Sequence, residues 1–348
     1  MPAISIDTFF ACSLMITVVV AAMAVTAKMV QPYLSGIEDL DQKEYLREIA
    51  DYILLNPGSP QNWGSNKTSP IESFGLAKNG SLAPYELDID KVCRLNPENA
   101  YHISYLSLIK AIKAKKVAIR ISIQQILDIL TTPIANQSDG SLTNYTFQIR
   151  VKRNGFPVSA SLHCYIIAKN FFNYVSAETS SNGEATVSFT IPNSSNGTAL
   201  LVTFARSSQD SRITSYAVYT FGHLSRNPLP NNSFVSLSPL NYTLYANKRF
   251  KNATFLEAYA LTYSYNETMT PISNVTYTIP KFLDKSPIVL VVTGTNSSTF
   301  FAEWTAYPQI PLEMGANMQS SENSSFMYIV SINQALYEIR IQCEGASE

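Results

Sequence analysis

The chain has 348 residues, and its 26 acidic and 25 basic side chains leave a formal net charge of −1. A balance this close to neutral argues against a nucleic acid or an acidic polymer as a partner. Charged residues make up only 15% of the sequence, against about 25% in ordinary soluble domains. The surface therefore needs another source of solubility.

An uncharged, mostly apolar segment occupies residues 8–27, TFFACSLMITVVVAAMAVTA, and ends at Lys28. About 20 such residues in one helix match the hydrocarbon thickness of a bilayer. A secretory signal has a basic start and a shorter apolar core of about 7–15 residues. Residues 1–7 contain no Lys or Arg, although Ala22 and Ala24 would permit cleavage. The segment therefore predicts a single N-terminal membrane helix.

The orientation of this helix has two conflicting indications. Lys28, Lys43 and Arg47 follow the apolar segment, and basic residues favour the cytoplasmic side. Against this, every Asn-X-Ser/Thr sequon follows the helix, and such sequons accept N-linked glycans in exported proteins. We expect the body to lie outside the cell, with sugar supplying the missing solubility, although composition alone would produce some sequons. The candidate glycosylation sites are Asn66, Asn79, Asn136, Asn144, Asn193, Asn196, Asn231, Asn241, Asn252, Asn266, Asn274, Asn296 and Asn323.

The helical pattern continues beyond the membrane segment, so residues 1–56 are predicted to form one hydrophobic and amphipathic stem helix. Pro32 is expected to kink it, and Asn56-Pro57-Gly58 is expected to end it. The amphipathic half has aliphatic residues at three- and four-residue spacing, which is typical of a helix with one buried face: Leu46, Ile49 and Ile53.

Residues 57–140 contain a connecting segment with a second helix near 99–113, where isoleucine and leucine recur every third residue. Residues 117–130, VAIRISIQQILDIL, are expected to begin as a strand and finish as a helix.

From residue 141 the hydrophobic period changes to two, which indicates β-strands. Residues 141–225 contain strand patterns separated by Asn154-Gly155 and Asn182-Gly183, and such dipeptides favour hairpin turns. Short strands separated by turns predict an antiparallel, immunoglobulin-like β-sandwich. Residues 223–233, HLSRNPLPNNS, form a linker, and 226–348 predict a second sandwich-like domain or a large sheet. The fold class is thus α+β and mostly β, with a long N-terminal helix before antiparallel β-sandwich domains.

Four cysteines are present. Cys12 lies inside the apolar helix, and Cys164 lies in a strand pattern that favours a buried free thiol. Cys93 and Cys343 could form a disulfide that ties the C-terminal end back to the base, although a sequence does not determine connectivity.

No catalytic or cofactor motif emerges. His102, His163 and His223 lie far apart and have no ligand set at metal-binding spacing. No phosphate-binding glycine loop or nucleophile elbow occurs. Asp88 and Asp90 in LDIDK match a fragment of a calcium loop, but the loop glycine and closing glutamate are missing. We therefore expect no enzyme activity, no cofactor and no metal site.

The N-terminal part, ISIDTFFACSLMITVVV followed by YILLNPGSPQNWG, resembles archaeal type IV pilin-like surface proteins. In pilins an acidic residue near the mature N-terminus pairs with the amine of a neighbouring subunit inside the filament core. Asp7 matches this residue, since it is the fifth residue if the chain begins at Ala3. Prepilins also carry a basic leader, and this sequence has only Met1-Pro2 at that place.

Residues 151–192 separately resemble immunoglobulin-like modules of surface proteins. The shared pattern is N-G-x-P-V-x-A, here from Asn154 to Ala160, followed by G-x-A-x-x-x-F-x-I-P, here from Gly183 to Pro192. The resemblance implies a spacer or adhesive module and supplies no catalytic residue.

Two hypotheses follow. In the first, the chain is a structural subunit of an archaeal extracellular filament. It lies in the membrane before assembly, then assembles with copies of itself through the N-terminal helix and presents glycosylated β domains for adhesion. In the second, it is a single-span, membrane-anchored glycoprotein or adhesin that does not polymerise. Asp7 favours the filament and the missing leader favours the anchor. Small residues in the helix would permit close helix packing in the filament: Ala11, Ser13, Ala21, Ala22 and Ala24.

Overall fold

The computed structural model describes residues 6–68, 70–114, 117–318 and 324–345, without the side chains of residues 6–8 and 30–41. Strands account for 50% of the chain and helices for 16%, which confirms the mostly β fold class with an N-terminal apolar helix. The chain divides between residues 49 and 50 into two compact units. The first is helical, and the second contains the β body.

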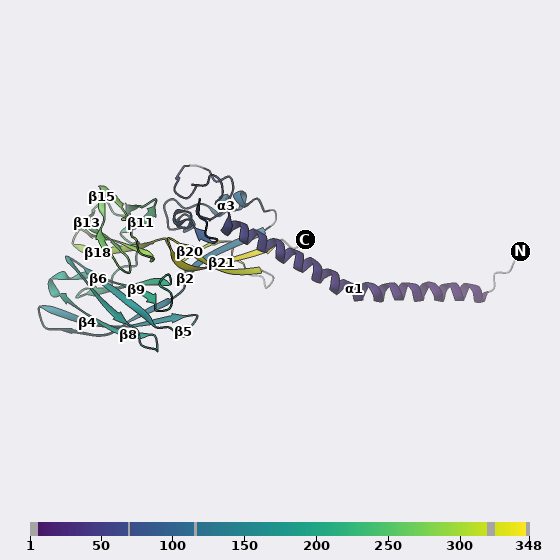
Figure 1. The fold of residues 1–348 in the computed structure, drawn as a ribbon, viewed down its shortest axis with the longest axis horizontal. Helices are drawn as coiled ribbons and strands as arrows, with labels where there is room; N and C mark the ends of the chain where they lie inside the picture. Colours follow the sequence, from purple (N-terminus) through teal and green to yellow (C-terminus); the bar gives the residue numbers. More distant parts are fainter. Residues whose placement is uncertain (1–5, 69, 115–116, 319–323, 346–348) are drawn as a thin grey trace. The chain divides into compact units, whose positions relative to one another are not determined.

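Helix α1 (Ile6–Leu55), purple in Figure 1, has 50 residues. It remains helical through Pro32. It ends where the sequence predicts: the Asn56 N–H still donates to the Tyr52 carbonyl at 3.0 Å. Gly58 then adopts a φ of 74°, and its N–H donates to Asn56 Oδ1 at 2.7 Å. A left-handed glycine after a helix end is a common stop because it has no Cβ to clash.

The predicted first sandwich is present and consists of two antiparallel sheets (Figure 1). One sheet contains β3 (Asp128–Ser138), β4 (Leu142–Arg153), β5 (Phe156–Pro157) and β8 (Glu184–Pro192). The other contains β6 (Ala160–Ala168), β7 (Phe171–Glu178), β9 (Gly197–Ser207) and β10 (Thr214–His223). Their facing side chains form one core, which includes Phe147, Phe189 and Leu162. The β4–β5 turn is the predicted Asn154-Gly155, with φ values of 52° and 82°.

A second sandwich follows the 223–233 linker. Its first sheet contains β11 (Val235–Leu240), β12 (Thr243–Lys248), β15 (Thr270–Ser273) and β16 (Thr276–Thr278). Its second sheet contains β13 (Ala253–Leu261), β14 (Asn266–Thr268), β17 (Ile288–Asn296) and β18 (Thr299–Tyr307). Leu237, Leu244 and Val292 lie in the core between these sheets.

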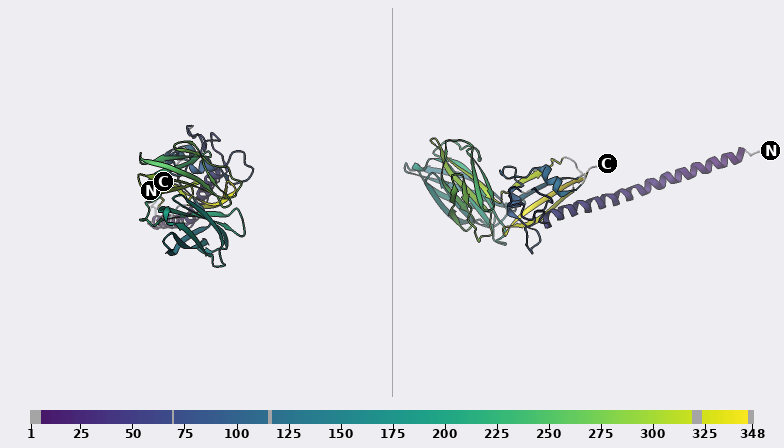
Figure 2. Two further views of the ribbon diagram at one scale, coloured as in Figure 1. Left: turned by 90° about the vertical axis from the view of Figure 1, so that its left-hand side faces the viewer. Right: turned by 90° about the horizontal axis from the view of Figure 1, so that it is seen from above.

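The two sandwiches share a third hydrophobic core, in which Ile167 and Val202 of the first pack with Val289 and Val291 of the second. Strands β9 and β17 are therefore buried on both faces: every residue of 199–205 and of 288–294 is buried. In Figure 2 the teal strands of the first sandwich lie next to the green strands of the second. The result is a stack of four sheets.

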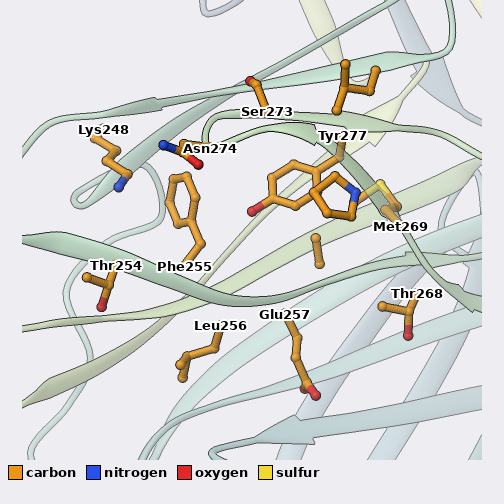
Figure 3. Close-up of a pocket in the computed structure, with 13 residues that line it drawn as sticks. Lys248, Thr254, Phe255, Leu256, Glu257, Thr268, Met269, Ser273, Asn274 and Tyr277 are labelled. Atoms are coloured by element: carbon orange, nitrogen blue, oxygen red, sulfur yellow. The ribbon is translucent and has the colours of Figure 1, made fainter.

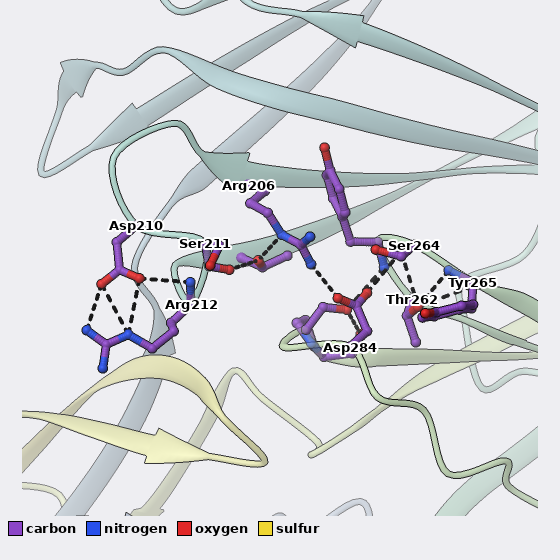
Figure 4. Close-up of polar contacts among 12 residues, drawn as sticks. Arg206, Asp210, Ser211, Arg212, Thr262, Ser264, Tyr265 and Asp284 are labelled. Atoms are coloured by element: carbon purple, nitrogen blue, oxygen red, sulfur yellow. Dashed lines mark hydrogen bonds and ion pairs between the residues drawn. The ribbon is translucent and has the colours of Figure 1, made fainter.

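Polar contacts reinforce this joint (Figure 4). Arg206 of β9 forms an ion pair with Asp284, with 2.6 Å between Nη2 and Oδ1. The other oxygen of Asp284 accepts the Ser264 N–H at 2.9 Å. The Arg206 guanidinium lies 3.8 Å from the centroid of the Tyr263 ring. Tyr165 of β6 donates its hydroxyl to the Thr262 carbonyl at 3.0 Å.

The structure corrects the predicted domain boundaries at both ends of the β region. A five-stranded sheet has the order β1 (Glu86–Leu87), β20 (Ser324–Ile332), β21 (Ala335–Gly345), β2 (Val117–Gln125) and β19 (Leu312–Gly315). Strands β19, β20 and β21 thus belong to this sheet and not to the second sandwich, and the segment 57–140 supplies β1 and β2. The predicted helical finish of 117–130 is wrong, because the chain bends after β2 and continues as β3 in the first sandwich.

Two short helices lie in the segment 57–140: α2 (Ile89–Cys93) and α3 (Tyr105–Ile112). Helix α3 is the predicted second helix, but it starts later than residue 99. Ser104 caps it by accepting the Ser107 N–H, and Lys113 ends it in the left-handed conformation with a φ of 59°.

Candidate functional site

The apolar part of α1, Phe9–Met29, is the one helix among the described residues that is long and apolar enough to cross a membrane. None of these residues is buried, and Phe9 is 73% exposed. Two hydroxyls inside the segment form hydrogen bonds within the helix itself. Thr17 Oγ1 donates to the Ser13 carbonyl at 2.9 Å, and Thr26 Oγ1 donates to the Ala22 carbonyl at 2.8 Å. Such internal bonds suit an environment without water.

Asp7, the predicted assembly residue, lies in the first turn of α1. Its side chain lies outside the part of the chain that the structure describes. The backbone places Asp7 two residues before Phe9, at the edge of the apolar segment.

The predicted glycosylation sites are all accessible where the structure describes them, since none of the twelve is buried. Asn323 lies outside the described residues. Three sites are half-buried: Asn66, Asn193 and Asn296. The exposed ones are Asn79, Asn136, Asn144, Asn196, Asn231, Asn241, Asn252, Asn266 and Asn274.

Asn231 and Asn193 are sites whose side-chain nitrogens already donate hydrogen bonds. Asn231 bridges to β18: its Nδ2 donates to the Trp304 carbonyl at 2.8 Å, and its Oδ1 accepts the Trp304 N–H at 2.9 Å. Asn193 Nδ2 donates to Ser138 Oγ at 3.2 Å. A glycan on either nitrogen would compete with these bonds, whereas Asn136 in the edge strand β3 is exposed.

The structure does not form the disulfide considered for Cys93 and Cys343. Both are buried free thiols, as is Cys164, the last as the sequence predicts. Cys93 packs in the core of the second sandwich, while Cys343 lies in β21, opposite Ile119 of β2. Cys93 lies at the end of helix α2, whereas Cys343 lies in a strand of the five-stranded sheet.

Asp88 and Asp90, the calcium-like fragment, have structural roles. Asp88 caps α2 by accepting the N–H groups of Asp90 and Lys91. Asp90 is buried, and its Oδ1 accepts the Tyr307 hydroxyl at 2.7 Å and the Asn241 N–H at 2.7 Å. Burial raises the pKa of Asp90, although both hydrogen bonds oppose this shift.

Metal-ligating side chains do not converge in the described part of the chain, which contains no group of three or more His, Cys, Asp and Glu placed to hold a metal ion. The three histidines lie on separate elements and contact other groups. His163 stacks on Tyr174, with 5.3 Å between ring centroids. His223 shares a hydrogen bond of 3.0 Å with the Tyr145 hydroxyl.

A cleft of about 570 Å³ lies in the second sandwich beside β13 (Figure 3). Phe255, Met269 and Tyr277 provide its apolar wall, and the sequon residue Asn274 lies among its lining residues. Its one lining carboxylate, Glu257, accepts the Tyr259 hydroxyl. Lys248 also lines the cleft, and its Nζ lies 4.7 Å from the centroid of the Phe255 ring.

A further cleft has residues that the sequence did not single out, Lys169 and Arg226 among them. They come from a strand turn and from the linker, so no local motif connects them. In the sequence, only their positions in turn-rich segments indicate that Lys169 and Arg226 lie on the surface.

Comparisons with known proteins assign no family. No protein-family model and no curated protein matches the sequence. HBP35 of Porphyromonas gingivalis aligns at 9% identity and a TM-score of 0.21, over 52% of this chain and 63% of that one. Human GIVD cytosolic phospholipase A2 aligns at 8% identity and a TM-score of 0.14, over 67% of this chain and 33% of that one. The chain spans less than two thirds of both structures, and likenesses this low carry no conclusion about its fold or function.

Proposed function

We propose that the chain is a structural subunit of an archaeal type IV pilus-like extracellular filament. The apolar parts of α1 would form the filament core, and the β domains would form its outer surface, carry N-linked glycans and serve adhesion. The observation that supports this most directly is α1 itself, a single helix from Ile6 to Leu55 whose segment Phe9–Met29 is apolar and exposed.

An exposed apolar helix needs a covering surface. Phe9, Leu14 and Met23 are each about two-thirds exposed or more, and burying each such side chain contributes about 1.5–3 kcal/mol. A bundle of identical helices would provide this cover outside the membrane. The small residues from Ala11 to Ala24 would let the helices approach closely.

The alternative is a single-span membrane anchor for a surface glycoprotein. The 21-residue length of Phe9–Met29 matches the bilayer core, and the internally bonded Thr17 and Thr26 hydroxyls suit lipid as well as a helix bundle. In this case the body would remain attached to the cell as a monomer.

Cryo-electron microscopy of material sheared from the native cells tests the two proposals. Filaments in which side-chain density identifies this chain, with residues 9–29 in a central bundle, would support the filament subunit. Recovery of the chain only in detergent-extracted membranes, as a single-span species, would favour the anchor.

The substitution Asp7→Ala tests the assembly residue. We expect filament yield to fall strongly, because removing the carboxylate leaves the neighbouring subunit's amine unpaired in an apolar core, which is costly. The β body should keep its thermal unfolding temperature. Glu178→Ala, at an exposed strand end, serves as the control and should leave the yield unchanged. An undiminished yield of the Asp7 variant would contradict the pairing role.

A further inference from the structure

A cleft of about 360 Å³ lies where turns of both sandwiches meet the linker. The β6–β7 turn supplies Lys169, the linker supplies residues 225–229, and the β17–β18 turn supplies residues 298–299. Phe234 and Phe300, both buried, also line it. We call this site the basic cleft. Its volume falls within the range of about 300–1,000 Å³ that is typical of small-molecule sites.

Two glycines allow the backbone segments of the basic cleft to come together. A Cβ on Gly197 would lie 3.2 Å from the Phe300 Cβ, and the φ of Gly197 is +129°. A Cβ on Gly222 would lie 2.5 Å from the carbonyl oxygen of Arg226. Side chains at either position would push the β17–β18 turn or the linker away, so the cleft depends on both glycines.

The charged side chains that line the basic cleft are all positive. Lys169 and Arg226 contribute two cations, and the described lining residues include no carboxylate. The remaining polar lining consists of hydroxyl and amide side chains: Asn196, Thr198, Ser225, Asn227, Ser298 and Thr299. Two of the hydroxyls already donate hydrogen bonds within the protein. Thr198 donates to the Phe300 carbonyl at 3.3 Å, and Ser225 donates to the Gly197 carbonyl at 3.0 Å.

We propose that the basic cleft binds an acidic sugar residue through its carboxylate or sulfate group. An arginine fork matches the planar geometry of a carboxylate, and lysine adds a second positive charge. Ser298, Thr299 and Asn227 offer both donors and acceptors, which is what sugar hydroxyl groups require. The site lies wholly in the β body, so it does not depend on whether the chain polymerises.

The test measures binding of two matched disaccharides by isothermal titration calorimetry. Glucuronosyl-glucose and cellobiose differ by one carboxylate, and glucose 6-sulfate against glucose provides a second, sulfated pair. The full chain is produced in a host without N-glycosylation and kept in detergent, because Asn196 lines the cleft and is itself a sequon.

We expect the acidic sugar of at least one pair to bind ten-fold or more tightly than its neutral counterpart, with an affinity that falls as salt rises. Preference for the uronate or for the sulfate identifies the natural acidic group. Arg226→Gln and Lys169→Gln should each weaken binding about ten-fold. The matched controls are Arg153→Gln and Lys152→Gln, two exposed cations of β4 outside the cleft, and they should bind as the unchanged chain does.

Three results would overturn the proposal: no measurable binding of either acidic sugar, equal affinity for acidic and neutral sugars, or equal weakening by the control substitutions. Because all four substitutions replace surface cations that form no core, each variant is expected to keep the unfolding temperature of the original chain. That measurement separates lost binding from lost folding.

Discussion

At the scale of single residues, two buried cations organise the segment 57–103, which has little regular structure. Lys91 of α2 is fully buried, and its Nζ donates to the carbonyls of Pro57 at 2.8 Å and Ala77 at 2.7 Å. Arg94 Nε donates to the Tyr101 carbonyl at 2.9 Å. Burial lowers the pKa of Lys91 to about 8. The loops are thus held by side-chain bonds to backbone carbonyls, which replace the ladder bonds of a sheet.

The reactivity of the buried cysteine thiols is also a property of single residues. Burial raises the pKa of Cys164 and of Cys343 to about 12, so at pH 8 only about one thiol in ten thousand is ionised, and the thiolate is the reactive form. In the folded chain we expect no modification of Cys93, Cys164 or Cys343 by iodoacetamide at pH 8. In denaturant without reductant, mass spectrometry should find all four cysteines alkylated. Detection of only two alkylated cysteines, with the Cys93 and Cys343 peptides joined by a disulfide, would contradict the free thiols.

At the scale of elements, the joint between the sandwiches depends on strands β9 and β17. Their sequences, ALLVTFA and IVLVV, are continuous apolar runs and not alternating ones. Such runs are typical of strands covered on both faces. The sequence thus contained the signal for a buried joint, but it did not show that each of the two strands is covered by the other sandwich.

The Arg206–Asp284 pair should contribute measurably to this joint. Their side chains are only 19% and 5% exposed, and removing one partner of a buried pair costs about 3–5 kcal/mol because the other charge is left unpaired. We expect Arg206→Ala to lower the free energy of unfolding by about 3 kcal/mol in chemical denaturation. The double variant Arg206→Ala/Asp284→Ala should lose less than the sum of the single losses.

Arg212→Ala is the matched control for that experiment. Arg212 pairs with Asp210 in an exposed turn, with 54% of its side chain accessible (Figure 4). Exposed pairs contribute about 0–1 kcal/mol. Equal losses for Arg206→Ala and Arg212→Ala would show that the joint does not depend on the buried pair.

The buried hydroxyl of Tyr165 at the joint predicts that the free energy of unfolding depends on pH. Burial raises the pKa of Tyr165 to about 12, while an unfolded tyrosine titrates near 10. Between these values the unfolded state binds fewer protons, so the free energy of unfolding falls by about 1.4 kcal/mol per pH unit for this group. Tyr165→Phe should make the slope between pH 10 and 12 shallower by this amount. An unchanged slope in the Tyr165→Phe variant would refute the assignment.

At the scale of the whole molecule, strand β2 and the C-terminal strand β21 meet in the five-stranded sheet. Ile119, Ile121 and Ile123 of β2 pair with Cys343, Ile341 and Ile339 of β21. The chain therefore leaves this sheet after β2, forms both sandwiches and returns to it. The five-stranded sheet is therefore complete only when the C-terminal strand β21 has paired with β2.

The apolar segment Phe9–Met29 belongs to the other compact unit, and its proposed role as a membrane anchor can be tested separately. A lysine at the centre of a membrane helix costs about 2.5–3.5 kcal/mol. We expect the pair Val19→Lys and Val20→Lys to release the chain from membranes on alkaline extraction, while Val19→Leu with Val20→Leu keeps it there. Full retention of the lysine variant in the membrane would show that Phe9–Met29 does not hold the chain.

The sequence by itself determined the features that depend on local pattern. These are the apolar length of 8–27, the helix stop at Asn56-Pro57-Gly58, the Asn154-Gly155 hairpin and the period-two strands. Each follows from backbone geometry within a few residues, so neighbouring side chains are sufficient to specify it.

Only the tertiary structure decided which surfaces meet. It paired β2 with β21, covered β9 and β17 on both faces, and left Cys93 and Cys343 as buried free thiols. It also brought Lys169 and Arg226 to one cleft from a turn and a linker. A strand pattern specifies which face is apolar but not which partner covers it. That choice depends on the packing and loop closure of the whole chain.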